Sequence, residues 1–490
     1  MKYIFNHYYI LKHDIKRTIL CSHDRTKSLV NVNKDWISYI HPAYAMILSF
    51  FSTPITIEEA VAKIAFFFDF SEEYTKKLIM NFIENKNEFH TKYQCESNEF
   101  PKNVIVSATE MADPIREYTP KDFIYSEIDL KTRRLFLSPL YATFMVSNKC
   151  ATNCVYCYAD RNTKYQPLSF EQIEKIIDEA STLNLCSFNL DGGDFFLFPK
   201  WRQLLQKLQK NNFYPNIIST KLPISEHDIK DFSKFNLSLQ VSIDSFTQEI
   251  LNNIVGSIPN YAAKMLKSLE DINNIMSFQI ATILTKYNSS IAELEKMYSF
   301  LDHLNNLRRW EIRVGFASLY SKKNFEDIQI DQTSITKIES WVKKKQLSSK
   351  FEIIWSPSNE VDFFMAQNGS IDFKGGACSA NSIHMFILPD GKVTICEQLY
   401  WNKRFLIGDL TKNSIQEVWN SKEALYLANM KQHDYSIESA CYSCKIFDEC
   451  KANQNSCYIN ILKVYGDEKW DYPDPRCSKA PRNISKKIYV

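Results

Sequence analysis

The chain has 490 residues, too many for a single ordinary domain, so we expect two or three domains. Hydrophobic residues make up 45% and aromatic residues 14% of the sequence, which is enough for packed cores and excludes wholesale disorder. The 59 Lys and Arg residues against 57 Asp and Glu residues leave a net charge of +2. This balance argues against nucleic acid or an anionic membrane as a partner held by overall charge.

The chain begins with MKYIFNHYYILKHD, which has neither the apolar region nor the small-residue cleavage site of an export signal. The longest apolar runs, such as Ala43–Phe51, have about half the length of a membrane span. We therefore expect a cytoplasmic protein with no membrane partner. Cytosolic cysteines are more often metal ligands or catalytic groups than disulfides, so the 13 cysteines are where the function should be sought.

Residues 1–95 predict a small α+β module. Two stretches rich in Tyr, Ile and Val predict short strands, at Tyr3–Leu11 and Thr18–Val32. Three helices follow, over Ala43–Phe51, from a Thr56/Glu59 capping box to about Phe68, and after a Ser71 cap. Residues 96–138 are polar and contain three prolines, Pro101, Pro114 and Pro120, so they predict a linker.

From residue 139 to 320 strand and helix patterns alternate. Six buried strands are predicted, at Ala142–Ser147, Ser187–Leu190, Asn216–Thr220, Leu237–Ile243, Phe278–Leu284 and Trp310–Ala317. Helical stretches such as Ser169–Leu183, with a Ser169/Gln172 capping box, lie between several of them. This α/β pattern predicts a parallel sheet, open or closed into a partial barrel, with its chemistry at the carboxyl ends of the strands. Residues 321–375 predict a bridging region before a cysteine-rich segment, 376–490.

Three cysteines directly follow the first strand of this β/α unit. Cys150, Cys154 and Cys157 have the spacing C-x3-C-x2-C, and three thiolates can hold a cubane iron–sulfur cluster while one iron stays without a protein ligand. A zinc site is the alternative, although zinc prefers four ligands and no fourth cysteine lies nearby. The spacing therefore favours a cluster with an open metal position.

The motif C-x3-C-x-aromatic-C, with Tyr156 as the aromatic residue, resembles the signature of radical S-adenosylmethionine (SAM) enzymes. The resemblance covers residues 139–320 and implies a partial (β/α)6 barrel of the radical SAM type. It also implies that Cys150, Cys154 and Cys157 hold a [4Fe–4S] cluster that binds SAM and cleaves it reductively. The resulting 5′-deoxyadenosyl radical would remove a hydrogen atom from the substrate, while the protein orients the partners and excludes water.

The same resemblance assigns SAM contacts at the ends of later strands. The segment Asp191-Gly192-Gly193-Asp194 is similar to the family's Gly-Gly-Glu segment, which binds the methionyl amino group, with Asp194 in place of Glu. Two of only 10 glycines lie here, as expected where backbone approaches a ligand closely. Ser242 and Asp244 resemble the family's ribose contact, with an ordinary strand-end turn as the alternative. Arg313 is a candidate partner of the SAM carboxylate, or a structural residue.

Seven cysteines lie between residues 378 and 477. The turn Pro389–Gly391 between two apolar runs predicts a β-hairpin flanked by Cys378 and Cys396. Seven cysteines exceed the needs of one metal ion, and two structural zinc sites are the alternative to clusters.

The order of these cysteines resembles the SPASM extension, which carries two auxiliary [4Fe–4S] clusters. Ile407-Gly408-Asp409-Leu410 followed by Ile415–Trp419 is also similar to that extension. The resemblance assigns Cys378, Cys396 and Cys457 to the first auxiliary cluster, and Cys441, Cys444, Cys450 and Cys477 to the second. Six residues separate Cys450 from Cys457 where the family usually has three, which leaves the role of Cys457 open.

The first auxiliary cluster lacks a fourth cysteine. His384 as a ligand and an iron open to a substrate thiolate are two options, but a hairpin histidine that points to solvent is the favoured interpretation of His384. Three cysteines remain, Cys21, Cys95 and Cys186, and we expect them to be buried as small hydrophobic residues.

The N-terminal strands and three helices resemble the PqqD-like leader-recognition element of ribosomal-peptide (RiPP) maturases. Such elements capture an extended leader as an added strand; a scaffolding or dimerisation domain is the alternative. The resemblance implies an enzyme that abstracts hydrogen from a precursor peptide and forms a crosslink, thioether or carbon–carbon, with epimerisation and oxidation left open. It also implies a reductant such as flavodoxin or ferredoxin.

Two other functions are compatible with the sequence. An anaerobic sulfatase-maturing enzyme would oxidise Cys or Ser to formylglycine, although that task does not explain a leader-binding module. A zinc-stabilised binding protein without turnover belongs to a different class. No general base is evident from the sequence.

Overall fold

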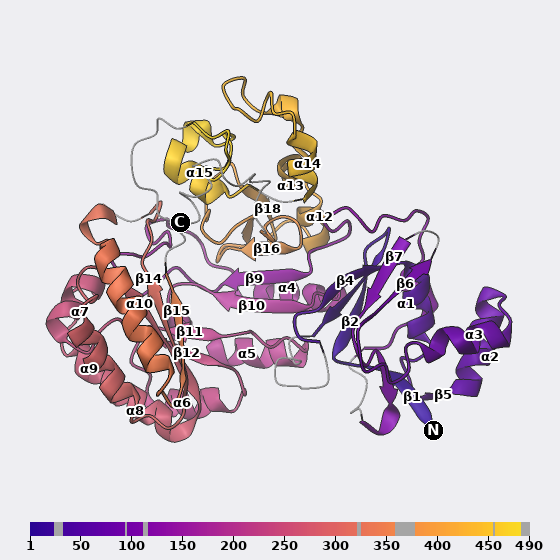
Figure 1. Ribbon diagram of the computed structural model, residues 1–490, viewed down its shortest axis with the longest axis horizontal. Helices are drawn as coiled ribbons and strands as arrows, with labels where there is room; N and C mark the ends of the chain where they lie inside the picture. Colours follow the sequence, from indigo (N-terminus) through magenta and orange to yellow (C-terminus); the bar gives the residue numbers. More distant parts are fainter. Residues whose placement is uncertain are drawn as a thin grey trace.

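The computed structural model describes residues 1–23, 33–93, 96–110, 116–320, 325–357, 378–453 and 456–481. It has an N-terminal α+β unit, a central barrel-like β/α unit and a C-terminal unit that lies over one end of the barrel strands (Figure 1). None of the described helices is long and apolar enough to cross a membrane.

The N-terminal unit contains three small antiparallel sheets, ordered β5-β1-β8, β2-β3-β4 and β6-β7. Its strands are β1 (Lys2–Phe5), β2 (Tyr9–His13), β3 (Thr18–Ser22), β4 (Ile37–Ile40), β5 (Ile55–Thr56), β6 (Phe89–Tyr93), β7 (Glu96–Phe100) and β8 (Ile105–Ser107). Its helices are α1 (Pro42–Ser49), α2 (Ile57–Phe68) and α3 (Glu72–Met80). The three predicted helices therefore form, and Thr56 and Ser71 cap α2 and α3 as the sequence indicates.

Two predictions for this unit differ from the structure. The single strand expected at Tyr3–Leu11 is two strands, because the Asn6 side chain accepts the backbone N–H of Tyr8 and turns the chain. Residues 96–138 are not wholly a linker: β7 and β8 belong to the sheets, and Phe123 is buried in the same core as the helices. These long-range pairings have no local sequence signal.

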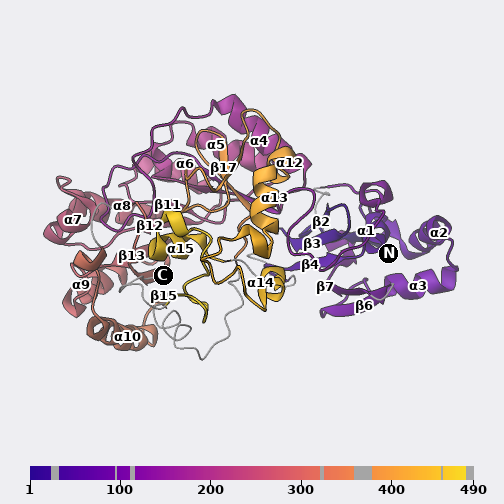
Figure 2. The ribbon, with the colours of Figure 1, turned by 90° about the horizontal axis from the view of Figure 1, so that it is seen from above.

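The central unit has seven strands in two parallel groups, β9–β10 and the five-stranded sheet β11-β12-β13-β14-β15, with helices along their outer side (Figure 2). The strands are β9 (Tyr141–Met145), β10 (Ser187–Asp191), β11 (Ile218–Thr220), β12 (Leu239–Ser242), β13 (Phe278–Leu284), β14 (Leu307–Val314) and β15 (Glu352–Ser356). The helices are α4 (Phe170–Thr182), α5 (Trp201–Lys210), α6 (Glu226–Ser233), α7 (Gln248–Val255), α8 (Tyr261–Ile275), α9 (Ile291–Leu301) and α10 (Gln332–Gln346). The six predicted strands form, and β15 adds a seventh inside the region predicted only as a bridge.

The C-terminal unit is joined to the barrel through a shared sheet. Its strands are β16 (His384–Ile387), β17 (Lys392–Thr394) and β18 (Leu406–Asp409), and its helices are α12 (Ile415–Trp419), α13 (Lys422–Asn429), α14 (Phe447–Asn453) and α15 (Tyr458–Tyr465). The predicted hairpin forms, with Gly391 at φ 82° in the turn between β16 and β17. On its other edge β16 pairs in parallel with β9, so one sheet runs β10-β9-β16-β17-β18.

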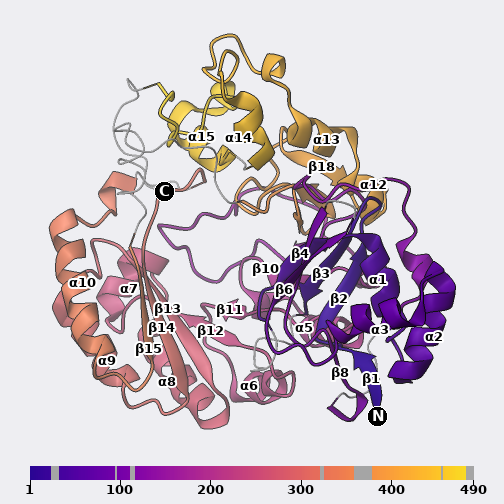
Figure 3. The same cartoon turned by 45° about the vertical axis from the view of Figure 1, so that its right-hand side comes forward.

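The β2–β3 hairpin packs the N-terminal unit against the barrel. Strand β3 is buried on both faces: Ile19 and Cys21 belong to the barrel core, whereas Leu20 belongs to the N-terminal core. A fully buried ion pair, Asp14 with Arg17 at 3.0 Å, lies at the end of the hairpin. Asp14 accepts the backbone N–H groups of residues 136 and 137, and Arg17 donates to the carbonyls of residues 132 and 134. The hairpin side chains thus hold the backbone of residues 132–137, just before β9, in addition to the apolar packing between the two units (Figure 3).

Candidate functional site

The loop after β9 places the first three cysteines at the carboxyl end of the barrel strands. Cys150, Cys154 and Cys157 are half-buried, and α7 holds their loop through backbone N–H groups at positions 153 and 155 that donate to Val255 and Ile254. Burial raises the pKa of Cys150 to about 12 and also raises the pKa of Cys157, and each lies near enough to Cys154 for that thiol to add to the effect. Metal binding at these positions must therefore displace protons.

Two glycines allow the β10 loop to lie directly against the cysteine loop. Gly192 has φ 147°, and a Cβ on Gly193 would lie 2.0 Å from the carbonyl oxygen of Lys149. Backbone N–H groups of Gly193 and Asp194 donate to the carbonyls of Ser147 and Lys149 at 2.6 and 2.8 Å. The backbone of the β10 loop thus lies directly against residues 147–149, just before Cys150. Any side chain on Gly193 would displace that loop.

The side chain of Asp194 has a structural role. It is 2% exposed and accepts the Thr220 hydroxyl at 2.9 Å and the backbone N–H of Lys221 at 2.8 Å, and burial raises its pKa. Asp194 therefore ties the β10 loop to the end of β11. Its carboxylate is thus used within the protein, and the contact of this segment's backbone with the SAM amino group stays a prediction.

Tyr156 and Asp244 meet around a buried lysine. The Tyr156 hydroxyl donates to Asp244 Oδ2 at 2.6 Å, and Lys221 Nζ lies 2.8 Å from the same oxygen and 2.9 Å from the Tyr156 hydroxyl. Burial alone would lower the pKa of Lys221, but the Asp244 carboxylate raises it, so the amine stays charged.

Asp244 is therefore not the ribose contact that the sequence predicted. Its side chain is fully buried, and its second oxygen accepts the backbone N–H of Ile283 at 3.0 Å. The pair of carboxylate oxygens is occupied by Tyr156, Lys221 and this backbone group. Sequence reasoning missed Lys221, whose only signal was its position just after a strand end.

The other two predicted SAM contacts, Ser242 and Arg313, have polar partners on their own sheet. Ser242 is the last residue of β12, and its hydroxyl lies 3.3 Å from that of Ser219 on the neighbouring strand. A contact between Ser242 and the ribose therefore stays a prediction. Arg313 makes a two-bond ion pair with Glu311 at 2.6 and 2.7 Å, so its guanidinium is already engaged with a carboxylate.

A pair of carboxyl groups that sequence reasoning missed lies between the barrel and the C-terminal unit. Burial raises the pKa of Asp191, at the end of β10, and burial together with Asp191 raises the pKa of Glu397 to about 7. Asp191, burial and Glu397 together raise the pKa of Tyr158 well above its ordinary value. These groups therefore lie close together, and Glu397 can hold or release a proton near neutral pH. Only the position of Asp191 at a strand end pointed to this cluster.

The C-terminal cysteines fall into two groups, and within each group the thiols raise one another's pKa. Burial raises the pKa of Cys396 to about 12 and raises that of Cys457, and Cys378 contributes to both. Burial likewise raises the pKa of Cys441 to about 12 and raises those of Cys450 and Cys477, with Cys444 contributing to each. Within each of the two sets that the resemblance assigned, the thiols therefore lie near one another, and their roles as cluster ligands stay a prediction.

Among the described residues no three His, Cys, Asp or Glu side chains lie close enough together to bind one metal ion. The thiolates of a cubane cluster each bind a different iron and therefore stand farther apart than the ligands of one ion. The three cysteine groups have the donor chemistry that such clusters need.

His384 does not point to solvent, contrary to the favoured interpretation. Its Nε2 lies 2.9 Å from the Thr143 hydroxyl across the β9–β16 pair, and burial lowers its pKa to about 4. Cys21 and Cys186 are buried, as predicted, and Cys95 lies outside the described residues.

Comparison with known families identifies two parts of the chain. Residues 144–301 match the Radical SAM superfamily, and residues 378–445 match SPASM, an iron–sulfur cluster-binding domain. The chain contains a radical SAM domain and a SPASM domain. Its cofactors are accordingly SAM and iron–sulfur clusters, as the cysteine motifs predicted.

The radical SAM enzyme described here has relatives among peptide maturases. Mycofactocin maturase MftC of Mycobacterium ulcerans is 22% identical over 349 residues, which cover 69% of this chain and 88% of that protein. Among solved structures, Streptococcus suis SuiB bound to S-adenosylmethionine matches with a TM-score of 0.64 at 13% identity over 97% of this chain and 99% of that one. SuiB bound to precursor peptide SuiA matches with a TM-score of 0.64 at 15% identity over the same shares. The shared fold therefore includes the N-terminal unit.

Proposed function

We propose that this radical SAM enzyme is a peptide maturase that abstracts hydrogen from a ribosomally made precursor peptide and forms a crosslink, thioether or carbon–carbon. The observation that carries the proposal is the match over 97% of the chain to the structure of SuiB bound to precursor peptide SuiA. The relationship to a mycofactocin maturase supports the same substrate class.

The three cysteine groups are the proposed ligands of three [4Fe–4S] clusters. Cys150, Cys154 and Cys157 hold the SAM-binding cluster, which supplies reductive cleavage of SAM. Cys378, Cys396 and Cys457 hold the first auxiliary cluster. Cys441, Cys444, Cys450 and Cys477 hold the second. The support is that the thiols within each group perturb one another's pKa.

The protein itself contributes a fixed frame around the first cluster. Gly192 and Gly193 allow the β10 loop to support the cysteine loop, so its backbone is the proposed contact of the SAM amino group. The buried Lys221 neutralises Asp244 and holds Tyr156, one residue before Cys157. Ser242 is the remaining candidate for a ribose hydroxyl.

The inner face of the sheet is polar and is the proposed location of the peptide. Successive residues of a strand point to opposite faces, and Val241, Ile280 and Ile312 are buried in the core that contains the apolar residues of the barrel helices. The residues that precede them, Gln240, Gln279 and Glu311, therefore point to the inner face of the sheet. Across this face the Gln279 amide donates to Gln240 Oε1 at 2.9 Å. Such amides can bind the backbone of an extended peptide in place of water.

The N-terminal unit is the proposed leader-recognition element, of the PqqD-like kind. Its fixed position against the barrel, through strand β3 and the Asp14–Arg17 pair, would hold a captured leader at a constant distance from the cysteine loop. A constant distance restricts which residues of the peptide reach the site.

The proposal is tested by the mass of a candidate precursor peptide after anaerobic co-expression with the enzyme. A loss of hydrogens that disappears with Cys154→Ala and persists with Cys21→Ala, which removes a buried cysteine outside the three groups, is the expected result. If the mass is unchanged and deuterated solvent leaves no label, the peptide is not a substrate. A peptide from a sulfatase that gains formylglycine would instead establish the sulfatase-maturing activity.

A further inference from the structure

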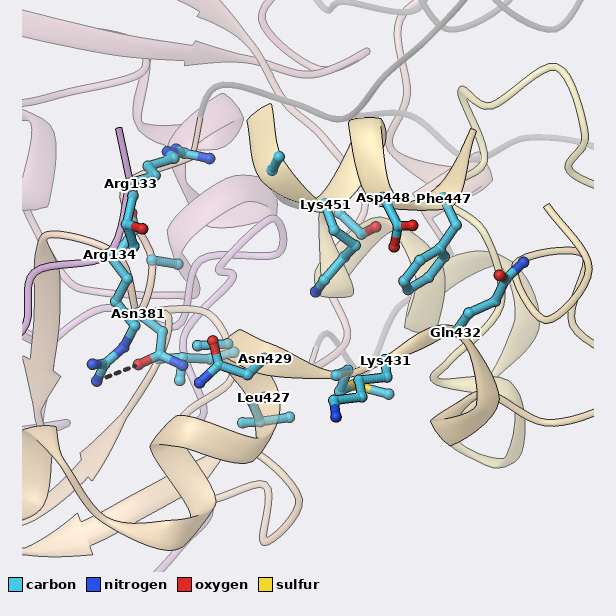
Figure 4. Close-up of a pocket in the computed structure, with 18 of the residues that line it drawn as sticks. Arg133, Arg134, Asn381, Leu427, Asn429, Lys431, Gln432, Phe447, Asp448 and Lys451 are labelled. Atoms are coloured by element: carbon cyan, nitrogen blue, oxygen red, sulfur yellow. Dashed lines mark hydrogen bonds between the residues drawn. The ribbon is translucent and has the colours of Figure 1, made fainter. Parts of the chain in front are cut away.

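A cavity of about 730 Å³ lies between the segment that precedes the barrel and the C-terminal unit. Figure 4 shows Arg133 and Arg134 on one wall and Lys451, from α14, on the other, with Lys431 and Gln432 below. The apolar side chains of Phe447 and Leu427 also line the cavity. The cavity thus joins three parts of the chain that are far apart in sequence, and its size is that of a ligand-binding site.

The charge of the cavity is strongly one-sided. Five cationic side chains line it, and Asp448 is the one carboxylate among the lining residues. The cations are Lys131, Arg133, Arg134, Lys431 and Lys451. None of the five forms an ion pair with a described residue, whereas Lys230, Lys267 and Lys343 on the barrel helices each have a carboxylate partner within 4 Å. A chain of net charge +2 therefore concentrates unneutralised positive charge at this place.

Two of these cations are held with unused donors. Arg134 stacks on the Trp419 ring at 4.3 Å and donates to the Trp419 carbonyl, yet its Nε is buried without a hydrogen-bond partner. Arg133 donates to the carbonyl of Cys378, and its Nη1 is likewise buried without a partner. Burial lowers the pKa of Arg134 to about 10, so the guanidinium is still charged at neutral pH. Unmet donors of this kind cost free energy until an acceptor reaches them.

The cavity walls also contact cysteines of both auxiliary groups. The Gln432 amide donates to the carbonyls of Cys441 and Cys444, at 3.3 and 2.9 Å. Cys450 lies on α14, next to Lys451, and Arg133 contacts Cys378. A molecule bound here lies beside the backbone of both cysteine groups at once.

We infer that this basic cavity is the docking surface of an acidic electron-carrier protein. The inference rests on the proposed function, because reductive cleavage of SAM consumes one electron that must come from outside the chain. That electron leaves the reduced carrier, which is oxidised by one electron, and docking itself forms and breaks no covalent bond. Carboxylates on the carrier match the five unpaired cations, and electron-transfer encounters are small and steered by charge.

The binding experiment uses the full reconstituted protein and a reduced, acidic flavodoxin as the probe. The variant Lys131→Glu/Lys431→Glu reverses two exposed charges at the rim, and Lys264→Glu/Lys337→Glu makes the same change on α8 and α10, away from the cavity. At low ionic strength the rim variant should bind about tenfold more weakly, and the control variant should bind as the parent does. Equal weakening in both variants, or none in the rim variant, would overturn the inference.

A second readout separates this inference from the proposed function. With dithionite in place of flavodoxin, the rim variant should cleave SAM as fast as the parent, because a small reductant does not need the docking surface. With flavodoxin its half-saturating carrier concentration should rise about tenfold, while the maximal rate stays unchanged. If the rim variant instead loses affinity for the precursor peptide, the cavity is a peptide subsite and the carrier assignment is wrong. If the parent modifies no peptide but the carrier data hold, only the proposed substrate fails.

Discussion

At the scale of single residues, the closest contact near the first cysteine group is that of Gly193 with Lys149. In Gly193→Ala the new Cβ would lie 2.0 Å from the Lys149 carbonyl oxygen, so the loop before Cys150 must move. We expect iron content after anaerobic reconstitution to fall from about twelve toward about eight per chain, with the fold retained by circular dichroism. Gly466→Ala is the control: alanine at its φ of 79° strains the backbone, but its Cβ meets nothing within 4 Å, so backbone strain without a clash should leave the iron content near that of the parent. A full iron content in Gly193→Ala would contradict the supporting role of the β10 loop.

The buried Lys221 gives a second prediction. Lys221→Met leaves the Asp244 carboxylate buried without its counter-ion, which should cost about 3–5 kcal/mol of stability. Denaturant unfolding of the variant measures this loss. The double variant Lys221→Met/Asp244→Asn should recover much of it, because the uncompensated charge is gone. No recovery would mean that packing around Lys221, rather than its charge, is what matters.

His384 predicts a dependence of stability on pH. Its pKa of about 4 lies below the ordinary value of 6.5 because the ring is buried. The unfolded chain takes up a proton below pH 6.5 while the folded chain does not, so stability should fall by about 1.4 kcal/mol per pH unit from 6.5 down to about 4. Unfolding midpoints at pH 7.5 and 5.5 would show this, and His384→Gln should make the difference between them smaller. An equal difference in the variant would assign it to other groups.

The sequence predicts which residues take part in cofactor binding better than it predicts the contacts that their side chains make. The spacing of the cysteines and the rarity of glycine mark the β9 and β10 loops, because both are local patterns. The assignment of Asp244 to ribose failed because the Lys221 that neutralises it lies 23 residues earlier, on another strand end. His384 was misjudged because its partner, Thr143, is 241 residues away. Side-chain pairing across a sheet leaves no trace in local spacing.

At the scale of elements, the β2–β3 hairpin makes the N-terminal unit part of the barrel. Arg17→Met leaves Asp14 buried and unpaired, so we expect a loss of about 3–5 kcal/mol and faster proteolysis within residues 96–138. Limited trypsin digestion followed by mass spectrometry measures the second effect. Lys16→Met is the control, since its ion pair with Glu127 is on the surface and contributes little. Unchanged cleavage in Arg17→Met would show that apolar packing of β3 is sufficient.

Elements with a strong local pattern were predictable, and those defined by partners were not. The capping boxes of α2 and α4 and the β16–β17 turn form where the sequence placed them. Strand β15 was missed because its short apolar run, Ile353–Trp355, lies within a polar, lysine-rich region, and the strand is ordered by pairing with β14. Strands β7 and β8 were taken for linker for the same reason.

At the scale of the whole molecule, the SPASM domain supplies a strand to the barrel sheet. A chain that ends at residue 357 lacks β16 and exposes the edge of β9, with its apolar residues Ala142 and Phe144. Exposed apolar edge strands aggregate, so we expect most of this chain to be insoluble. A chain that ends at residue 410 keeps β16 to β18 and should be more soluble, as measured by the soluble fraction and size exclusion. Equal solubility of the two would show that the β9–β16 pair is dispensable.

The β9–β16 pair also sets an order of events during synthesis. Thr143 meets His384, 241 residues later in the chain, and at typical elongation rates this interval takes roughly 10–50 s. Throughout that time the strand beside the first cysteine group lacks one neighbour while the ribosome is still at work. The nascent enzyme therefore offers its cysteines to iron and to oxygen before its sheet is complete. Iron–sulfur assembly on the first cysteine group can therefore begin before translation of the chain is complete.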